Sequence, residues 1–126
     1  MRLIKGKELP FEPASHEDPM APGVYKRVLA SKEDLFAGQV QMVNWAKLPQ
    51  GASFACHYHQ DMEEVFIMLD GLVSAVVDGA DVRLEAGDCL IVNPGEHHQM
   101  TNLSDFDVHY VVIGIAGTKN GKTVVV

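Results

Sequence analysis

The residues best suited to chemistry lie between Gly51 and Gly71, where His57 and His59 are two positions apart. Alternate side chains of a β-strand share a face, so both imidazoles point the same way. At a rise of about 3.3 Å per residue their Cα atoms lie roughly 7 Å apart, which lets both rings reach one ion. Two adjacent carboxylates, Glu63 and Glu64, follow closely. The stretch therefore predicts a metal site.

A second group, between Gly87 and Asn102, supplies His97 and His98 directly after a turn. Three imidazoles and one carboxylate suit borderline divalent ions, namely Zn, Fe, Mn, Ni, Co or Cu. Such a set disfavours Mg and Ca, which prefer oxygen ligands. The residues alone leave open which of the two histidines joins the site.

The choice between Glu63 and Glu64 depends on the turn at residues 60–62. Glu64 lies five positions after His59, which is the wrong parity for one continuous strand. The turn must reset the register for Glu64 to point inward, in which case Phe66 and Met68 share its face. Without that reset Glu63 is the inward carboxylate.

The elements that position these residues are short strands separated by glycine or proline turns. Such turns every 8–12 residues are typical of an all-β sandwich or barrel. Asp70-Gly71 and Asp78-Gly79 are the strongest tight-turn signals. Strands are expected over residues 24–30, 39–48, 53–59, 64–70, 72–77, 82–85, 89–92, 99–102, 108–115 and 123–126.

The domain organisation is predicted to be an extended N-terminal arm, residues 1–22, followed by one barrel domain, residues 23–126. The arm contains four of the six prolines, and its polar composition predicts a solvated His16. A chain of 126 residues fits one domain. The two cysteines form no CxxC pattern, and no structural disulfide is expected.

Charge and hydropathy limit the partners. The formal net charge of −7 argues against nucleic acid and anionic membranes, because phosphate binding requires a basic surface. No apolar run approaches the roughly 20 residues that span a bilayer. The first residues, MRLIKGKELPFEP, lack the apolar core of a secretory signal, so a cytoplasmic location is expected.

With these two groups of residues, the chain resembles the cupin superfamily, which has two signature motifs. The first motif is Gly, five residues, His-x-His, three or four residues, Glu, six residues, Gly. It is matched by Gly51, His57, His59, Glu64 and Gly71. The second is Gly, five residues, Pro-x-Gly, two residues, His, three residues, Asn. Its matching positions are Gly87, Gly95, His98 and Asn102, with Asn93 in place of the proline.

The resemblance implies a small single-domain β-barrel with the double-stranded β-helix, or jelly-roll, fold. It also implies that His57, His59, Glu64 and His98 ligate one divalent transition-metal ion, and that the protein is a homodimer. Cupins include dioxygenases, decarboxylases, isomerases, lyases and non-catalytic modules that bind sugars or effectors. Fold alone does not choose among these activities.

The expected function is binding of a small oxygenated organic molecule, similar to an organic acid, at an open coordination position of the metal. Turnover is left open: the alternatives are a metal-dependent dioxygenase, decarboxylase or isomerase, and a non-catalytic binding module. His109 and Glu63 are the candidates for an acid or base. His109 faces inward if Tyr110 and Val112 face out. The apolar lining is expected to come from Phe54 or Phe66, Met68, Ile91 and Met100.

Overall fold

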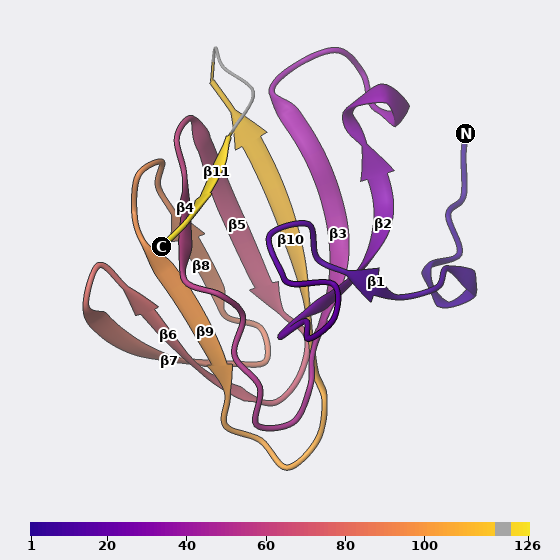
Figure 1. Cartoon of the computed structure of the whole chain (residues 1–126). Coiled ribbons are helices and arrows are strands. Elements are labelled where there is room, and N and C mark those ends of the chain that lie inside the picture. Colours follow the sequence, from indigo (N-terminus) through magenta and orange to yellow (C-terminus); the bar gives the residue numbers. More distant parts are fainter. Residues whose placement is uncertain (118–121) are drawn as a thin grey trace.

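The computed structural model describes residues 1–117 and 122–126 and consists of two antiparallel β-sheets that face each other (Figure 1). The six-stranded sheet has the order β1 (Glu12–Pro13), β2 (Tyr25–Ser31), β3 (Val40–Leu48), β10 (Val108–Ala116), β5 (Met62–Met68) and β8 (Cys89–Val92). The five-stranded sheet has the order β11 (Thr123–Val125), β4 (His57–His59), β9 (His98–Asn102), β6 (Leu72–Val77) and β7 (Ala80–Glu85). Two 3₁₀ turns, η1 (Gly6–Glu8) and η2 (Lys32–Asp34), flank β1 and β2. The expected all-β jelly-roll architecture is confirmed.

Alternating burial along the central strands separates an inner from an outer face. Every second residue of β5 and β10 is buried, as the period of two in a half-buried strand requires. The inner faces of both sheets meet in one hydrophobic core. Among its largest fully buried side chains are Leu48, Phe54, Met68, Val73, Met100 and Val108.

The chain passes from one sheet to the other at several connections, and two of these frame β5. Residues 60–61 lead from β4 in the five-stranded sheet to β5 in the six-stranded sheet, and residues 69–71 lead back to β6. Asp70-Gly71 is thus a corner between sheets. Asp78-Gly79, by contrast, joins β6 to β7 in a hairpin in which Val77 pairs with Ala80. Both Asp78 and Gly79 have positive φ, as a tight hairpin turn of this kind requires.

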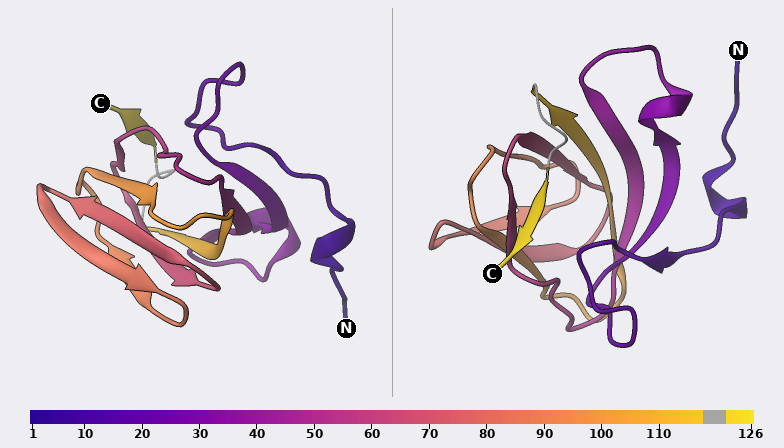
Figure 2. Two further views of the ribbon diagram at one scale, coloured as in Figure 1. Left: turned by 90° about the horizontal axis from the view of Figure 1, so that it is seen from below. Right: turned by 45° about the horizontal axis from the view of Figure 1, so that its top comes forward.

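The N-terminal segment packs on its own barrel (Figures 1 and 2). β1 pairs with the first residues of β2, and Ala14 is buried in the core beside Val24. The carboxylate of Glu17 accepts hydrogen bonds from the backbone amides of Gly23 (2.7 Å) and Ala55 (2.8 Å). These contacts anchor residues 14–24 near β4, where the predicted metal ligands begin.

Two further observations bear on the environment of the fold. Cys56 and Cys89 are free thiols, in agreement with the expectation of no disulfide. Within residues 1–117 and 122–126, the structure has no helix of the length and apolar character that crossing a bilayer demands.

Candidate metal centre

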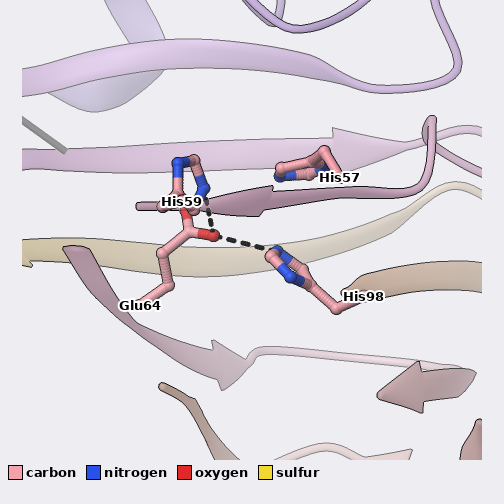
Figure 3. A group of neighbouring side chains, drawn as sticks. All are labelled: His57, His59, Glu64 and His98. Atoms are coloured by element: carbon pink, nitrogen blue, oxygen red, sulfur yellow. Dashed lines mark hydrogen bonds and ion pairs between the residues drawn. The ribbon is translucent and has the colours of Figure 1, made fainter. Parts of the chain in front are cut away.

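Four buried side chains from both sheets converge on one point (Figure 3). His57 and His59 come from β4, and His98 begins β9 directly opposite His57 in the ladder. Glu64 comes from β5 in the facing sheet. One potential ligand atom from each residue lies within 4.8 Å of the others. The structure therefore brings together the four residues that the cupin motifs indicate.

Glu64 points inward because the chain changes sheet between β4 and β5. The parity that holds along one strand does not carry over to a strand in the facing sheet. In β5 the buried positions are Met62, Glu64, Phe66 and Met68, so Phe66 and Met68 share the inner face with Glu64 as expected. Glu63 lies on the opposite face, in a surface depression outside the cluster.

A hydrogen bond at Nδ1 fixes the orientation of each of the three histidine rings. Nδ1 of His57 lies 2.7 Å from the carbonyl oxygen of Ala55, and Nδ1 of His98 lies 2.9 Å from that of Glu96. Nδ1 of His59 lies 2.9 Å from the hydroxyl oxygen of Thr123 on β11. Such outer contacts orient metal-binding histidines and set their tautomer.

The contact between His98 and Glu64 requires a positive charge. A carbonyl oxygen only accepts hydrogen bonds, so Nδ1 of His98 carries a proton and a neutral His98 has a lone pair on Nε2. That Nε2 lies 3.0 Å from Oε1 of Glu64, which also has only lone pairs when ionised. The two atoms attract each other only if a proton or a metal ion lies between them. The donor set thus fits a bound cation.

Burial and hydrogen bonding favour the protonation states that a metal needs. Burial lowers the pKa of His57 to about 3, and the neighbouring His16 adds to this effect. Burial opposes ionisation of Glu64, but hydrogen bonds to His59 and His98 outweigh it and lower the pKa of that carboxyl. At neutral pH His57 is therefore uncharged and Glu64 is ionised, and these are the forms that bind metals.

A cavity of about 130 Å³ adjoins the cluster, and His57, His59 and Glu64 form part of its wall. Its volume is comparable to cavities that hold one benzene molecule, so it accommodates only a small ligand. The apolar part of the wall consists of Ala14, Val24, Met42, Ala46, Phe54, Met62, Phe66 and Val112. The further polar side chains that line it are Ser15, His16, Tyr25, Lys26, Asn44, Tyr110 and Thr123.

The expected apolar lining is partly confirmed. Phe54 and Phe66 both line the cavity. Met68 and Met100 are buried in the core beside it and do not line it. The prediction for Ile91 is wrong: its exposed fraction is 55%, because it lies on the edge strand β8 and faces outward.

The expectation of a solvated His16 is also wrong. Its ring stacks on that of His57, with 4.0 Å between centroids and 27° between planes, and it packs edge-on against Phe54. Burial, the largest effect, lowers the pKa of His16 to about 4. No local pattern marks this histidine, since it reaches the cavity only because residues 14–24 fold over the barrel.

The remaining candidates lie outside the cavity. His109 faces outward between the rings of Phe11 and Trp45, and its Nδ1 lies 3.1 Å from Oδ2 of Asp70. The buried positions of β10 are instead Val108, Tyr110, Val112, Gly114 and Ala116. His97 stacks on Tyr58, 4.7 Å between centroids, away from the cluster.

Comparison with known proteins finds relatives that are similar in sequence and a solved structure with the same fold. An oxalate-binding protein of Thermotoga maritima is 30% identical over 94 residues, which cover 75% of this chain and 72% of that protein. An uncharacterised protein of Sinorhizobium fredii is 31% identical over 72 residues, and this match covers 56% of the chain but only 33% of that longer protein. A crystal structure from Thermotoga maritima, of a protein described as a predicted oxalate decarboxylase, superposes with a TM-score of 0.81 at 26% identity. The superposition covers 92% of this chain and 100% of the Thermotoga maritima chain.

The family model for the cupin domain matches residues 44–114. This range includes both motifs and the four converging side chains, and it spans more than half of the 126 residues. The chain belongs to the cupin family.

Proposed function

We propose that the protein binds one divalent transition-metal ion through His57, His59, Glu64 and His98 and, with it, a small organic acid in the adjoining cavity. The observation that carries this proposal is the contact between Nε2 of His98 and Oε1 of Glu64, which is favourable only with a proton or a metal ion between the two atoms. Without such a cation, two buried acceptor atoms would face each other, which is costly.

The donor set narrows the ion to Zn, Fe, Mn, Ni, Co or Cu, because three imidazole nitrogens and one carboxylate oxygen suit borderline metals. When bound, such an ion supplies Lewis-acid character and one or two open coordination positions. The protein residues orient the donors: Ala55, Glu96 and Thr123 fix the rings, and the facing sheet supplies the carboxylate.

The ligand class is supported by the cavity and by one relative. Lys26 is one of the residues that line the cavity, and its positive charge favours an anionic ligand there. The small volume and the apolar wall of the cavity suit a ligand with a short carbon skeleton. The Thermotoga maritima relative is named as an oxalate-binding protein, which is in keeping with a small carboxylic acid.

Binding without turnover is the second candidate function. It is favoured by the location of His109 and Glu63, the two acid–base candidates, which both lie outside the cavity. The enzymatic alternative is a metal-dependent dioxygenase, decarboxylase or isomerase. Oxygen uptake or release of carbon dioxide on incubation with candidate acids would favour it, and stoichiometric binding of an unchanged acid would favour the binding module.

The test of the proposal is elemental analysis of the purified protein followed by titration with oxalate. We expect about one metal ion per chain and saturable binding of the acid. His98→Ala should lose the ion, and the acid should no longer bind. His97→Ala is the matched control, because the neighbouring histidine lies outside the cluster. Retention of stoichiometric metal in His98→Ala would contradict the ligand assignment.

We also propose that the protein is a homodimer. The outer face of the six-stranded sheet carries apolar side chains in adjacent register, with Val65 opposite both Ile91 and Ile113. A cluster of partly exposed β-branched residues of this kind is typical of a surface that packs against a partner. Light scattering should give a mass of about twice 13.8 kDa. A monomeric mass across the micromolar range would refute the proposal.

A further inference from the structure

Buried polar atoms without a partner indicate where a ligand completes the structure. Among the described residues, three buried side-chain nitrogen or oxygen atoms make no hydrogen bond: Nε2 of His16, Oδ1 of Asn44 and Nε1 of Trp45. His16 and Asn44 both line the cavity. His16 Nε2 has the carboxylate of Glu17 nearby, at 3.4 Å. The Asn44 oxygen is therefore the one that most needs a partner from the cavity.

The orientation of the Asn44 amide is set by its neighbour on the same strand. Its Nδ2 lies 2.9 Å from the sulfur of Met42, towards which it donates. The reverse orientation would place the amide oxygen against a thioether, and neither atom carries a proton. Oδ1 is therefore the free atom, and it can only accept a hydrogen bond. Its partner must be a donor.

Asn44 lies on the same inner sheet face as the metal ligand Glu64. Asn44 pairs with Val112, which pairs in turn with Phe66, the next inward residue after Glu64 on β5. The side chain is 5% exposed, and its nearest neighbours on the inner face, Met42 and Ala46 along β3 and Val112 directly across on β10, are apolar. A single small molecule in the cavity can thus contact an ion at Glu64 and the amide of Asn44.

We propose that Asn44 is a specificity-determining residue that accepts a hydrogen bond from a hydroxyl group of the ligand, so that the cavity prefers a small hydroxy acid. This inference rests on the proposed binding of an organic acid at the metal. The carboxylate of the ligand would bind the ion, and the hydroxyl group would donate its hydrogen bond to Oδ1 of Asn44. An acid without a hydroxyl leaves Oδ1 unpaired and binds less tightly, because a buried polar group without a partner is unfavourable.

The experiment compares malonate with hydroxymalonate, two acids that differ by one hydroxyl group, by calorimetric titration of the metal-loaded protein. We expect hydroxymalonate to bind about tenfold more tightly, as one hydrogen bond to a buried acceptor allows. Asn44→Leu, which has a similar shape and no acceptor, should reduce this ratio at least fivefold. Asn44→Ala serves the same purpose if leucine disturbs the packing. Gln41→Leu is the matched control, since this amide lies on β3 outside the cavity.

Each outcome decides between the proposals. An equal affinity of the wild type for both acids would overturn the role of Asn44 and leave the metal-dependent binding of acids intact. A preference that persists in Asn44→Leu would overturn it too, because the hydroxyl would then be bound by the metal. If neither acid binds to the metal-loaded protein although oxalate does, the role of Asn44 is overturned. If oxalate does not bind either, the proposed function fails, and this inference fails with it.

Discussion

The imidazole ring of His16 covers the ring of His57, with 4.0 Å between their centroids. One ring belongs to the N-terminal segment and the other to β4, which carries His57 and His59. Their contact places the N-terminal segment against the cluster of His57, His59, Glu64 and His98. Glu17 holds this arrangement in place through the backbone amides of Gly23 and Ala55.

The burial of both rings predicts a pH-dependent stability of the metal-free protein. Each pKa falls from 6.5 in a free histidine, to about 4 for His16 and about 3 for His57. The unfolded chain therefore takes up protons that the folded chain does not, and stability is lost as the pH falls below 6.5. Between pH 7 and pH 5 we expect a loss of about 2 kcal/mol per histidine in the free energy of unfolding.

Urea denaturation of the protein in the presence of a chelator, at pH 7 and at pH 5, measures this loss. His16→Phe keeps a stacked ring without a titratable group and should reduce the difference between the two pH values. His97→Phe changes a histidine that is exposed and should leave the difference as in the wild type. An unaltered difference in His16→Phe would contradict the buried, neutral state of His16.

The two adjacent carboxylates should respond differently to neutralisation. Glu64→Gln removes the charged ligand and should weaken metal binding by at least tenfold, because a neutral amide is a poor ligand in an imidazole-rich site. Glu63→Gln makes the same chemical change on the outer face of β5. Competition with a chromophoric chelator measures both affinities. Equal losses in the two variants would show that the charge acts at long range and not as a ligand.

The hydroxyl of Thr123, on the C-terminal strand β11, should increase the affinity of the cluster for a metal ion. It lies 2.9 Å from Nδ1 of His59, and loss of such an outer contact typically lowers metal affinity by about 10- to 100-fold. Thr123→Val keeps the shape of the side chain and should show a loss at the lower end of that range. Thr101→Val is the control, because its hydroxyl pairs with Ser53. The same chelator competition applies, and an unchanged affinity in Thr123→Val would argue against this contact.

Substitution by alanine is expected to lower the free energy of unfolding by different amounts at two turn glycines. Gly71 has φ of 69°, and a Cβ there would lie 2.4 Å from Cγ2 of Val108. Gly79 also has positive φ, at 83°, but a Cβ there meets no atom within 4 Å. Gly79→Ala should cost about 1 kcal/mol for the left-handed backbone alone. Gly71→Ala should cost about 2–4 kcal/mol, since the clash adds to that strain. Thermal unfolding of both variants checks the order, which equal costs would contradict.

Local patterns were sufficient to predict most of the cluster and the fold class. The spacing of His57 and His59 on one strand follows from the period of two, and tight turns such as Asp78-Gly79 mark the strand boundaries. The choice of Glu64 over Glu63 was harder. It depends on the change of sheet after β4, which is a tertiary feature that the parity of one strand does not contain.

The positions of the His16 and His109 side chains could not be predicted from local patterns. His16 lies among prolines and acidic residues, and it reaches the cavity only through the packing of Ala14 and the anchoring of Glu17. His109 was ambiguous because its strand, Val108–Ala116, is apolar on both faces. Its outward direction follows from the aromatic rings of Phe11 and Trp45, which cover that side of the sheet.

The pairing of Thr123 with His59 has a consequence for how the protein is made. His59 lacks its outer partner until a segment 64 residues further along the chain has been synthesised and has paired with β4. A growing chain on the ribosome therefore carries the histidines of the cluster well before it can hold them rigidly. High-affinity uptake of an ion is thus expected only after residue 123 has left the ribosomal tunnel and paired with β4.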